Sequence, residues 1–158
     1  MNYFSTTPHG IIALLLVFFA SGLGAEPANQ MPAMKEPQIA IQGYSPVSYF
    51  TWNIAEKGNP VFAADYNGKV YHLTSAEQAK EFQANPQKFV PLFAEYCPYS
   101  LALGRQVSID PTNFKIIDGK LLLFHKSEEM DGLKQWNDHG NDQELLEKAN
   151  QQYLRYTF

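Results

Sequence analysis

A pair of short turn signals constrains this fold more than any other feature of the 158-residue chain. The first is Asn67-Gly68, which separates Val61–Tyr66 from Lys69–Thr74. Asn-Gly tolerates the positive φ angles that a two-residue type I′ turn requires, so the pattern predicts a β-hairpin. Because side chains alternate along a strand, Tyr71 and Leu73 are expected on one face of the second strand.

The second turn signal is Asp118-Gly119, between Phe114–Ile117 and Lys120–His125. Asp-Gly favours the same kind of turn and predicts a second hairpin. Three successive leucines, Leu121–Leu123, then indicate a strand that is buried on both faces, or an edge strand covered by a helix.

Helix signals surround the two hairpins. Ser75 is a candidate N-cap, with Gln78 three residues on to complete a capping box. Asn85-Pro86 opens a short helix to Phe89, and further helices are predicted from Ser127 through Trp136 and from Asn141 to about Tyr156. The sequence therefore predicts a small α+β domain of two hairpins covered by several helices.

The N-terminal residues point to export. Residues 1–25 contain no charged side chain, and Ile11–Ala20 is an unbroken apolar run, which is typical of a signal peptide cut near residue 25. An uncleaved anchor is the alternative. Residues 26–38 hold three prolines and are interpreted as a flexible leader, with the folded domain at 39–158. We therefore expect a periplasmic or secreted protein without a stable membrane span after cleavage.

Net charge, cysteine count and missing motifs exclude several classes of function. The net charge of −4 argues against a nucleic-acid partner, which would need a basic face. A single cysteine rules out an intrachain disulfide. The chain contains no glycine-rich phosphate loop, no HExxH and no GxSxG motif. No catalysis is expected from these patterns.

Four segments together resemble a known family. They are AIQGYSPVSYF from residue 40, NGKVYHLTSAEQAKEFQANPQKF from residue 67, EYCPYSLALG from residue 95 and IDGKLLL from residue 117. In this order they resemble the secreted bacterial YHS-domain proteins, with the name-giving side chains at Tyr71, His72 and Ser75. The resemblance implies a YHS-type fold. It also implies kinship with TRASH-like domains, which are associated with metal binding through cysteines.

The cysteine positions of metal-binding relatives are occupied differently here. The resemblance places them at Ser48, Thr74 and Gln78. Hydroxyl and amide groups are poor ligands for copper or zinc compared with thiolates. The usual metal site of the family is therefore expected to be altered. The segment from Gly43 to Val47, where relatives carry Asp in place of Ser45, is interpreted as a turn before Pro46, and the alternative is that Ser45 is a polar pocket residue.

Cys97 is the remaining soft ligand. One hypothesis is a copper or zinc site formed by Cys97 and His72, with His125, His139 or Met130 as other partners. The alternatives are a buried small hydrophobic side chain, a reactive thiol and a mixed intermolecular disulfide.

These observations lead to three functional hypotheses. The first is a secreted or periplasmic YHS-domain module, not an enzyme, that binds a metal ion or small ligand near Cys97 and His72. The second is a structural or protein-docking domain with an inert, buried Cys97. The third is a thiol-based enzyme or redox protein.

Overall fold

The computed structural model describes Met1 and residues 36–157. The described residues after Lys35 belong to one compact unit, Glu36–Phe158. The predicted signal peptide beyond Met1, and residues 26–35 of the predicted leader, lie outside the described residues. Strand β1 already includes Gln38, the last residue assigned to the leader.

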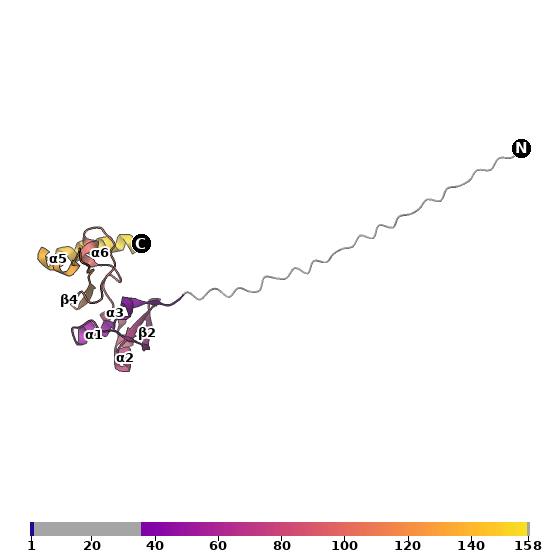
Figure 1. The fold of residues 1–158 in the computed structure, drawn as a ribbon, viewed down its shortest axis with the longest axis horizontal. Coiled ribbons are helices and arrows are strands. Elements are labelled where there is room, and N and C mark those ends of the chain that lie inside the picture. The colour runs from indigo at the N-terminus through magenta and orange to yellow at the C-terminus, as the bar shows by residue number, and fades with distance from the viewer. Residues whose placement is uncertain (2–35, 158) are drawn as a thin grey trace. The chain divides into compact units, whose positions relative to one another are not determined.

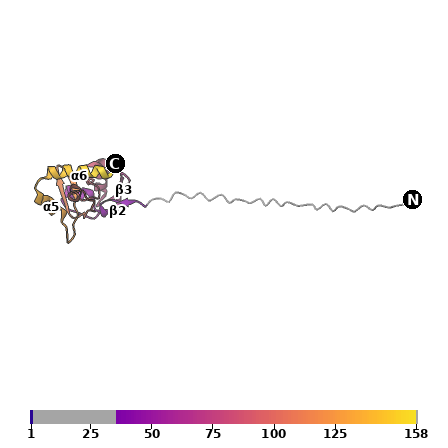
Figure 2. The ribbon, with the colours of Figure 1, turned by 90° about the horizontal axis from the view of Figure 1, so that it is seen from above.

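The unit is a small α+β domain, as the sequence predicted (Figures 1 and 2). Its elements, in chain order, are β1 (Gln38–Ile39), a 3-10 helix η1 (Ala40–Gly43), α1 (Pro46–Thr51), β2 (Asn59–Tyr66), β3 (Lys69–Leu73), α2 (Ala76–Ala84), α3 (Pro86–Phe89), α4 (Pro98–Ala102), β4 (Phe114–Ile117), β5 (Lys120–Leu123), α5 (Gly132–His139) and α6 (Asp142–Thr157). No helix within 36–157 is both long enough and apolar enough to cross a bilayer.

The first sheet has three strands in the order β1-β3-β2. The antiparallel pair β2 and β3 is the predicted first hairpin, with Tyr66 opposite Lys69. At its turn, Asn67 has φ 50° and Gly68 has φ 74°, which confirms the conformation expected of Asn-Gly. The short strand β1 pairs in parallel with the start of β3.

The second sheet consists of the predicted hairpin β4–β5, with Asp118 at φ 49° in its turn. Leu121, Leu122 and Leu123 are at most 2 % exposed, which confirms a strand buried on both faces. Both faces of β5 are buried because a hydrophobic cluster packs against each of them. Leu121 and Leu123 belong to a first hydrophobic cluster, whereas Leu122 belongs to a second.

The two clusters divide the domain between them. In Figure 1, β2, α1, α2 and α3 gather in one half, and β4, α5 and α6 in the other. The first cluster is built around Tyr49, Phe82 and Phe89, and the second around Phe124 and Trp136. Figure 2 shows α6 running along one side of the domain. On α6, Leu145 and Ala149 are buried, but Tyr156 near its end is 46 % exposed.

The N-cap of α2 follows the prediction with one difference. The Ser75 side chain accepts a hydrogen bond from the Gln78 backbone N–H at 3.2 Å, as a cap should. In a capping box the Gln78 side chain would return to the Ser75 N–H. Instead, its Oε1 accepts from the Thr74 N–H at 3.2 Å. The Gln78 amide also binds the buried hydroxyls of Ser45, just before α1, and of Ser48 on α1.

The predicted helix from Ser127 through Trp136 was wrong at its start. The helix α5 begins at Gly132, and Asp131 is its N-cap, accepting from the Lys134 N–H at 3.0 Å. Ser127 instead accepts from the Met130 N–H at 3.2 Å, which closes a turn. The carboxylate of Asp131 offers a charged acceptor at the positive end of the helix, and a serine hydroxyl does not.

The interpretation of Ser45 as a turn residue was wrong, because Ser45 directly precedes helix α1 and its hydroxyl binds a distant side chain. Ser45 is the extended residue immediately before this helix, but its hydroxyl makes no capping hydrogen bond. It is fully buried and donates to Gln78 Oε1 at 2.7 Å. A partner 33 residues away along the chain cannot be found from local turn propensities.

Candidate ligand-binding pocket

Cys97 lies inside the second cluster and is fully buried. It precedes α4, its N–H donates to the Val107 carbonyl at 2.8 Å, and its own carbonyl accepts from Leu101. The side chain packs against the first residue of α5: a Cβ added at Gly132 would lie 2.9 Å from Sγ. Packing of this density is typical of a structural cysteine.

His72 lies on β3, opposite Ala63 of β2. It is half-buried, and its Nδ1 would be 3.4 Å from a Cβ added at Gly43. Its strand neighbours Tyr71 and Leu73 belong to the first cluster. The structure therefore places His72 beside one core and Cys97 inside the other.

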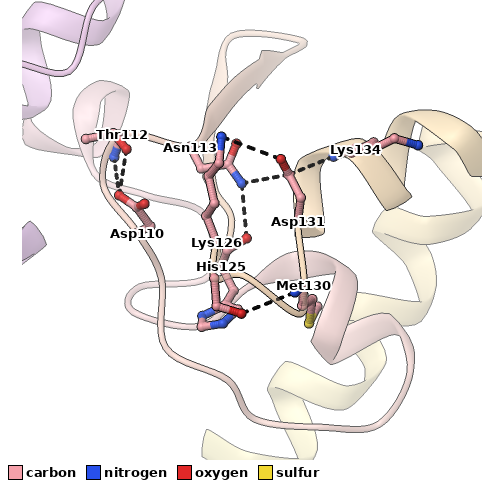
Figure 3. A network of polar contacts seen from close by, with 9 residues as sticks. Asp110, Thr112, Asn113, His125, Lys126, Met130, Asp131 and Lys134 are labelled. Carbon is pink, nitrogen blue, oxygen red and sulfur yellow. Dashed lines mark hydrogen bonds and ion pairs between the residues drawn. The ribbon is translucent and has the colours of Figure 1, made fainter.

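Of the other candidate metal partners of Cys97, His125 and His139 have polar partners of their own. Figure 3 shows His125 and Met130 in the segment that precedes α5. The Nδ1 atom of His125 is 2.9 Å from the Ser108 carbonyl oxygen. Met130 packs at the edge of the second cluster, and His139 Nε2 is 3.6 Å from Glu144 Oε2. Within residues 36–157, no three His, Cys, Asp or Glu side chains gather into a group that could hold a metal ion.

A polar network holds this segment in place (Figure 3). The buried Asn113 amide donates to the His125 carbonyl at 3.0 Å and to Asp131 Oδ1 at 3.1 Å. Asp131 is also 3.6 Å from Lys126 Nζ. Hydrogen bonding from the Lys134 backbone N–H, followed by the Asn113 amide and the charge of Lys126, keeps the pKa of Asp131 below its ordinary value. Because its groups satisfy one another, the network serves to fix the start of α5.

A second buried network occupies positions at which the family resemblance implies cysteines. Gln78 Nε2 donates to Ser48 Oγ at 3.1 Å, and Ser48 Oγ donates to Glu56 Oε2 at 2.8 Å. Thr74 joins through its backbone N–H, which binds Gln78 Oε1. Residues that are far apart in the sequence thus meet in one hydrogen-bonded network, which ends on the Glu56 carboxylate.

A cavity of about 300 Å³ lies beside β3 and reaches α6 and the segment after α3. Its lining residues come from η1, the first hairpin, the segment from Val90 to Glu95, and α6. They are Ala40, Ile41, Tyr66, Asn67, Lys69, Tyr71, Val90, Pro91, Ala94, Glu95 and Tyr153. We call this cavity the tyrosine pocket. Its volume is at the lower end of the range typical of small-molecule sites, about 300–1,000 Å³.

The walls of the tyrosine pocket include strained backbone. Ile41, Asn67 and Ala94 all line it and have φ of 50°, 50° and 52°. Asn67 sits in a turn that favours this conformation, but a β-branched isoleucine or an alanine adopts it at a cost of about 1–2 kcal/mol. Such strain tends to accumulate at functional sites, where the surrounding structure holds it in place.

Charged and phenolic groups meet in the same pocket. Lys69 Nζ lies 2.9 Å from Glu95 Oε1, and the two side chains are 24 % and 39 % exposed. Burial, then the nearby Glu95 carboxylate, Tyr66 and Tyr153, raise the pKa of Tyr71 to about 12. The Tyr71 phenol therefore stays protonated near neutral pH and can donate a hydrogen bond.

The tyrosine pocket was not foreseen from the sequence. No sequence motif marks Tyr153 or Glu95 as a ligand-binding residue. The sequence predicted that Tyr71 and Leu73 share one face of their strand, and in the structure both are buried. Local patterns carry no signal for the meeting of η1, β3, the segment after α3 and α6.

Comparison of the chain with protein-family models, with curated proteins and with solved structures found no match. The class that the structure defines is thus a small α+β domain with two β-hairpins and a pocket between its hairpin and its helices.

Proposed function

We propose that this chain is an exported, non-catalytic binding module of the YHS type, and that it holds a small organic ligand in the tyrosine pocket. The single observation that carries the proposal is the pocket itself. It combines a cavity of about 300 Å³, three tyrosines and a half-buried ion pair within walls that include strained backbone. An apolar cavity with a few convergent polar groups is the usual form of a small-molecule site.

Two features favour an organic ligand over a soft metal ion. Apart from the Glu56 carboxylate, the Ser48–Gln78 network supplies only hydroxyl and amide groups, which bind copper and zinc weakly. Of the residues of the metal hypothesis, Cys97 lies inside the second cluster, whereas His72 lies beside the first. The metal hypothesis still has its own test, which is titration of the protein with copper and zinc. Equal binding by the parent, Cys97→Ser and His72→Ala would reject it.

A structural role for Cys97 is the second candidate function, and complete burial of its side chain favours it. A nucleophilic or redox thiol has to reach its substrate as a thiolate. We therefore expect Cys97 to resist thiol reagents in the folded protein and to react only after unfolding. Rapid labelling under native conditions would revive the thiol-enzyme hypothesis.

The experiment that tests the proposal is a fragment screen of the chain from Glu26 onward, followed by protein-observed NMR. A chemically diverse set of small aromatic and aliphatic fragments is added, and amide shifts are mapped. We expect the perturbed amides to include Ile41, Asn67 and Glu95, because they line the pocket.

A matched pair of variants makes the screen decisive. Lys69→Trp places a large side chain in the pocket, and Lys120→Trp makes the same change at the equivalent hairpin position, just after Asp118-Gly119. Binding should be lost in Lys69→Trp and retained in Lys120→Trp. Absence of pocket shifts with every fragment, or equal binding by both variants, would overturn the proposal.

A further inference from the structure

The charges of the tyrosine pocket point to the class of its ligand. Of the residues that line it, only Lys69 and Glu95 are charged, so the lining has no net charge. Their charged atoms are 2.9 Å apart, and both side chains are partly shielded from water. The pocket therefore presents one cation and one anion side by side.

This pairing discriminates against a ligand with a single charge. An anion attracted by Lys69 is repelled by Glu95 almost as strongly, because the two groups are adjacent. A cation is attracted by Glu95 and repelled by Lys69 in the same way. A molecule that carries both charges a few ångströms apart can place its carboxylate near Lys69 and its ammonium near Glu95, and both contacts are then favourable.

The remaining surfaces of the pocket suit an apolar group. Ala40, Ile41, Val90 and Pro91 provide aliphatic contacts, and the tyrosines provide aromatic ones. The hydroxyls of Tyr49 and Tyr156 bind backbone carbonyls. Those of the pocket tyrosines have no such partner among the described residues, so they remain free to bind a polar ligand group.

We propose that the ligand is a small zwitterion with an apolar side group, the chemistry of an aromatic or aliphatic α-amino acid. This inference rests on the proposed function, because it assigns the ligand class of the same pocket. Lys69 would bind the carboxylate, Glu95 the ammonium group, and the Ile41 side of the pocket the apolar group.

The test compares three probes that share one aromatic ring and differ in charge. L-Phenylalanine carries both charges, phenethylamine only the ammonium and 3-phenylpropionate only the carboxylate. Each is titrated into the chain from Glu26 onward near neutral pH, with dissociation constants taken from NMR shifts. We expect L-phenylalanine to bind at least about tenfold more tightly than either singly charged probe.

Charge-removing variants should change this preference in opposite directions. Lys69→Met leaves Glu95 unopposed, so phenethylamine should become the tightest probe. Glu95→Gln leaves Lys69 unopposed, so 3-phenylpropionate should become the tightest. Lys120→Met, at the equivalent position of the second hairpin, should behave as the parent. Loss of a partly exposed ion pair costs about 0–1 kcal/mol, so both pocket variants should fold.

The outcomes separate this inference from the proposed function. Equal or tighter binding of a singly charged probe by the parent overturns the zwitterion assignment. So does failure of all three probes when other fragments still perturb the pocket, and in that case the proposed function stands. If no fragment and no probe perturbs the pocket, both proposals fall together.

Discussion

Replacement of Gly132 by alanine tests the packing of Cys97 most directly. The new Cβ would lie 2.9 Å from Cys97 Sγ and 3.3 Å from the His125 carbonyl oxygen. Favourable contacts between nonbonded atoms lie at about 3.5–4.0 Å, so Sγ or the start of α5 has to move by more than half an ångström. Added atoms in a filled core typically cost about 1–3 kcal/mol.

A gain in helix propensity opposes this cost. Gly132 is the first residue of α5, and alanine is favoured over glycine inside helices by up to about 1 kcal/mol. The expected net loss for Gly132→Ala is therefore about 1–2 kcal/mol of unfolding free energy. Cys97→Ala removes the sulfur atom that the new Cβ would meet. Gly132→Ala should therefore cost little or no unfolding free energy when it is made in the Cys97→Ala variant. We expect a favourable coupling of about 1–2 kcal/mol between the two sites.

The assay is urea denaturation of the parent, the two single variants and the double variant. Gly58→Ala with His72→Ala provides a contrasting cycle. A Cβ at Gly58 would clash with the His72 backbone oxygen, which truncation of the His72 side chain leaves in place. No rescue is expected there. Additive effects of Gly132→Ala and Cys97→Ala would refute the packing argument for Cys97.

Three further predictions address the network, the pocket and its strain. Gln78→Leu deprives the buried Ser45 hydroxyl of its acceptor and should cost about 1–3 kcal/mol in urea denaturation; a neutral effect would contradict the role of the network. The pKa of Tyr71 is about 12 when folded and about 10 when unfolded, so its share of stability should be present below pH 10 and be lost as the pH rises toward 12. Tyr71→Phe should weaken this alkaline loss in melting curves, and an unchanged pH profile would contradict it. Ala94→Gly should leave the melting temperature unchanged or raise it, because glycine adopts positive φ without strain; a clear decrease would show that Ala94 is not strained.

The parts of the fold that the sequence predicted are those decided by local chemistry. Asn67-Gly68 and Asp118-Gly119 form turns because their preferred backbone angles match those of a tight hairpin. Ser75 caps α2 because its acceptor lies only three residues from the N–H that it binds. Leu121–Leu123 is buried on both faces, as an unbroken apolar run suggests.

The errors arose where a distant partner decided the outcome. Ser127 and Asp131 are both acceptable caps by local rules, but the Asn113 amide fixes Asp131 in place from another part of the chain. Ser45 in front of Pro46 looks like a turn residue, yet its hydroxyl is bound by Gln78 of α2. Local propensities contain no information about either hydrogen bond.

The tyrosine pocket shows why a binding site is harder to predict than the elements that form it. Ile41 is a poor residue for positive φ, so local rules would place it in a strand, and only its burial at 3 % exposure offsets that preference. The burial depends on β3, which is distant in sequence. Lys69 and Glu95 are separated by 26 residues, and each looks like an ordinary surface charge until the fold brings them together. The site therefore exists only at the level of tertiary contacts, which local sequence patterns do not encode.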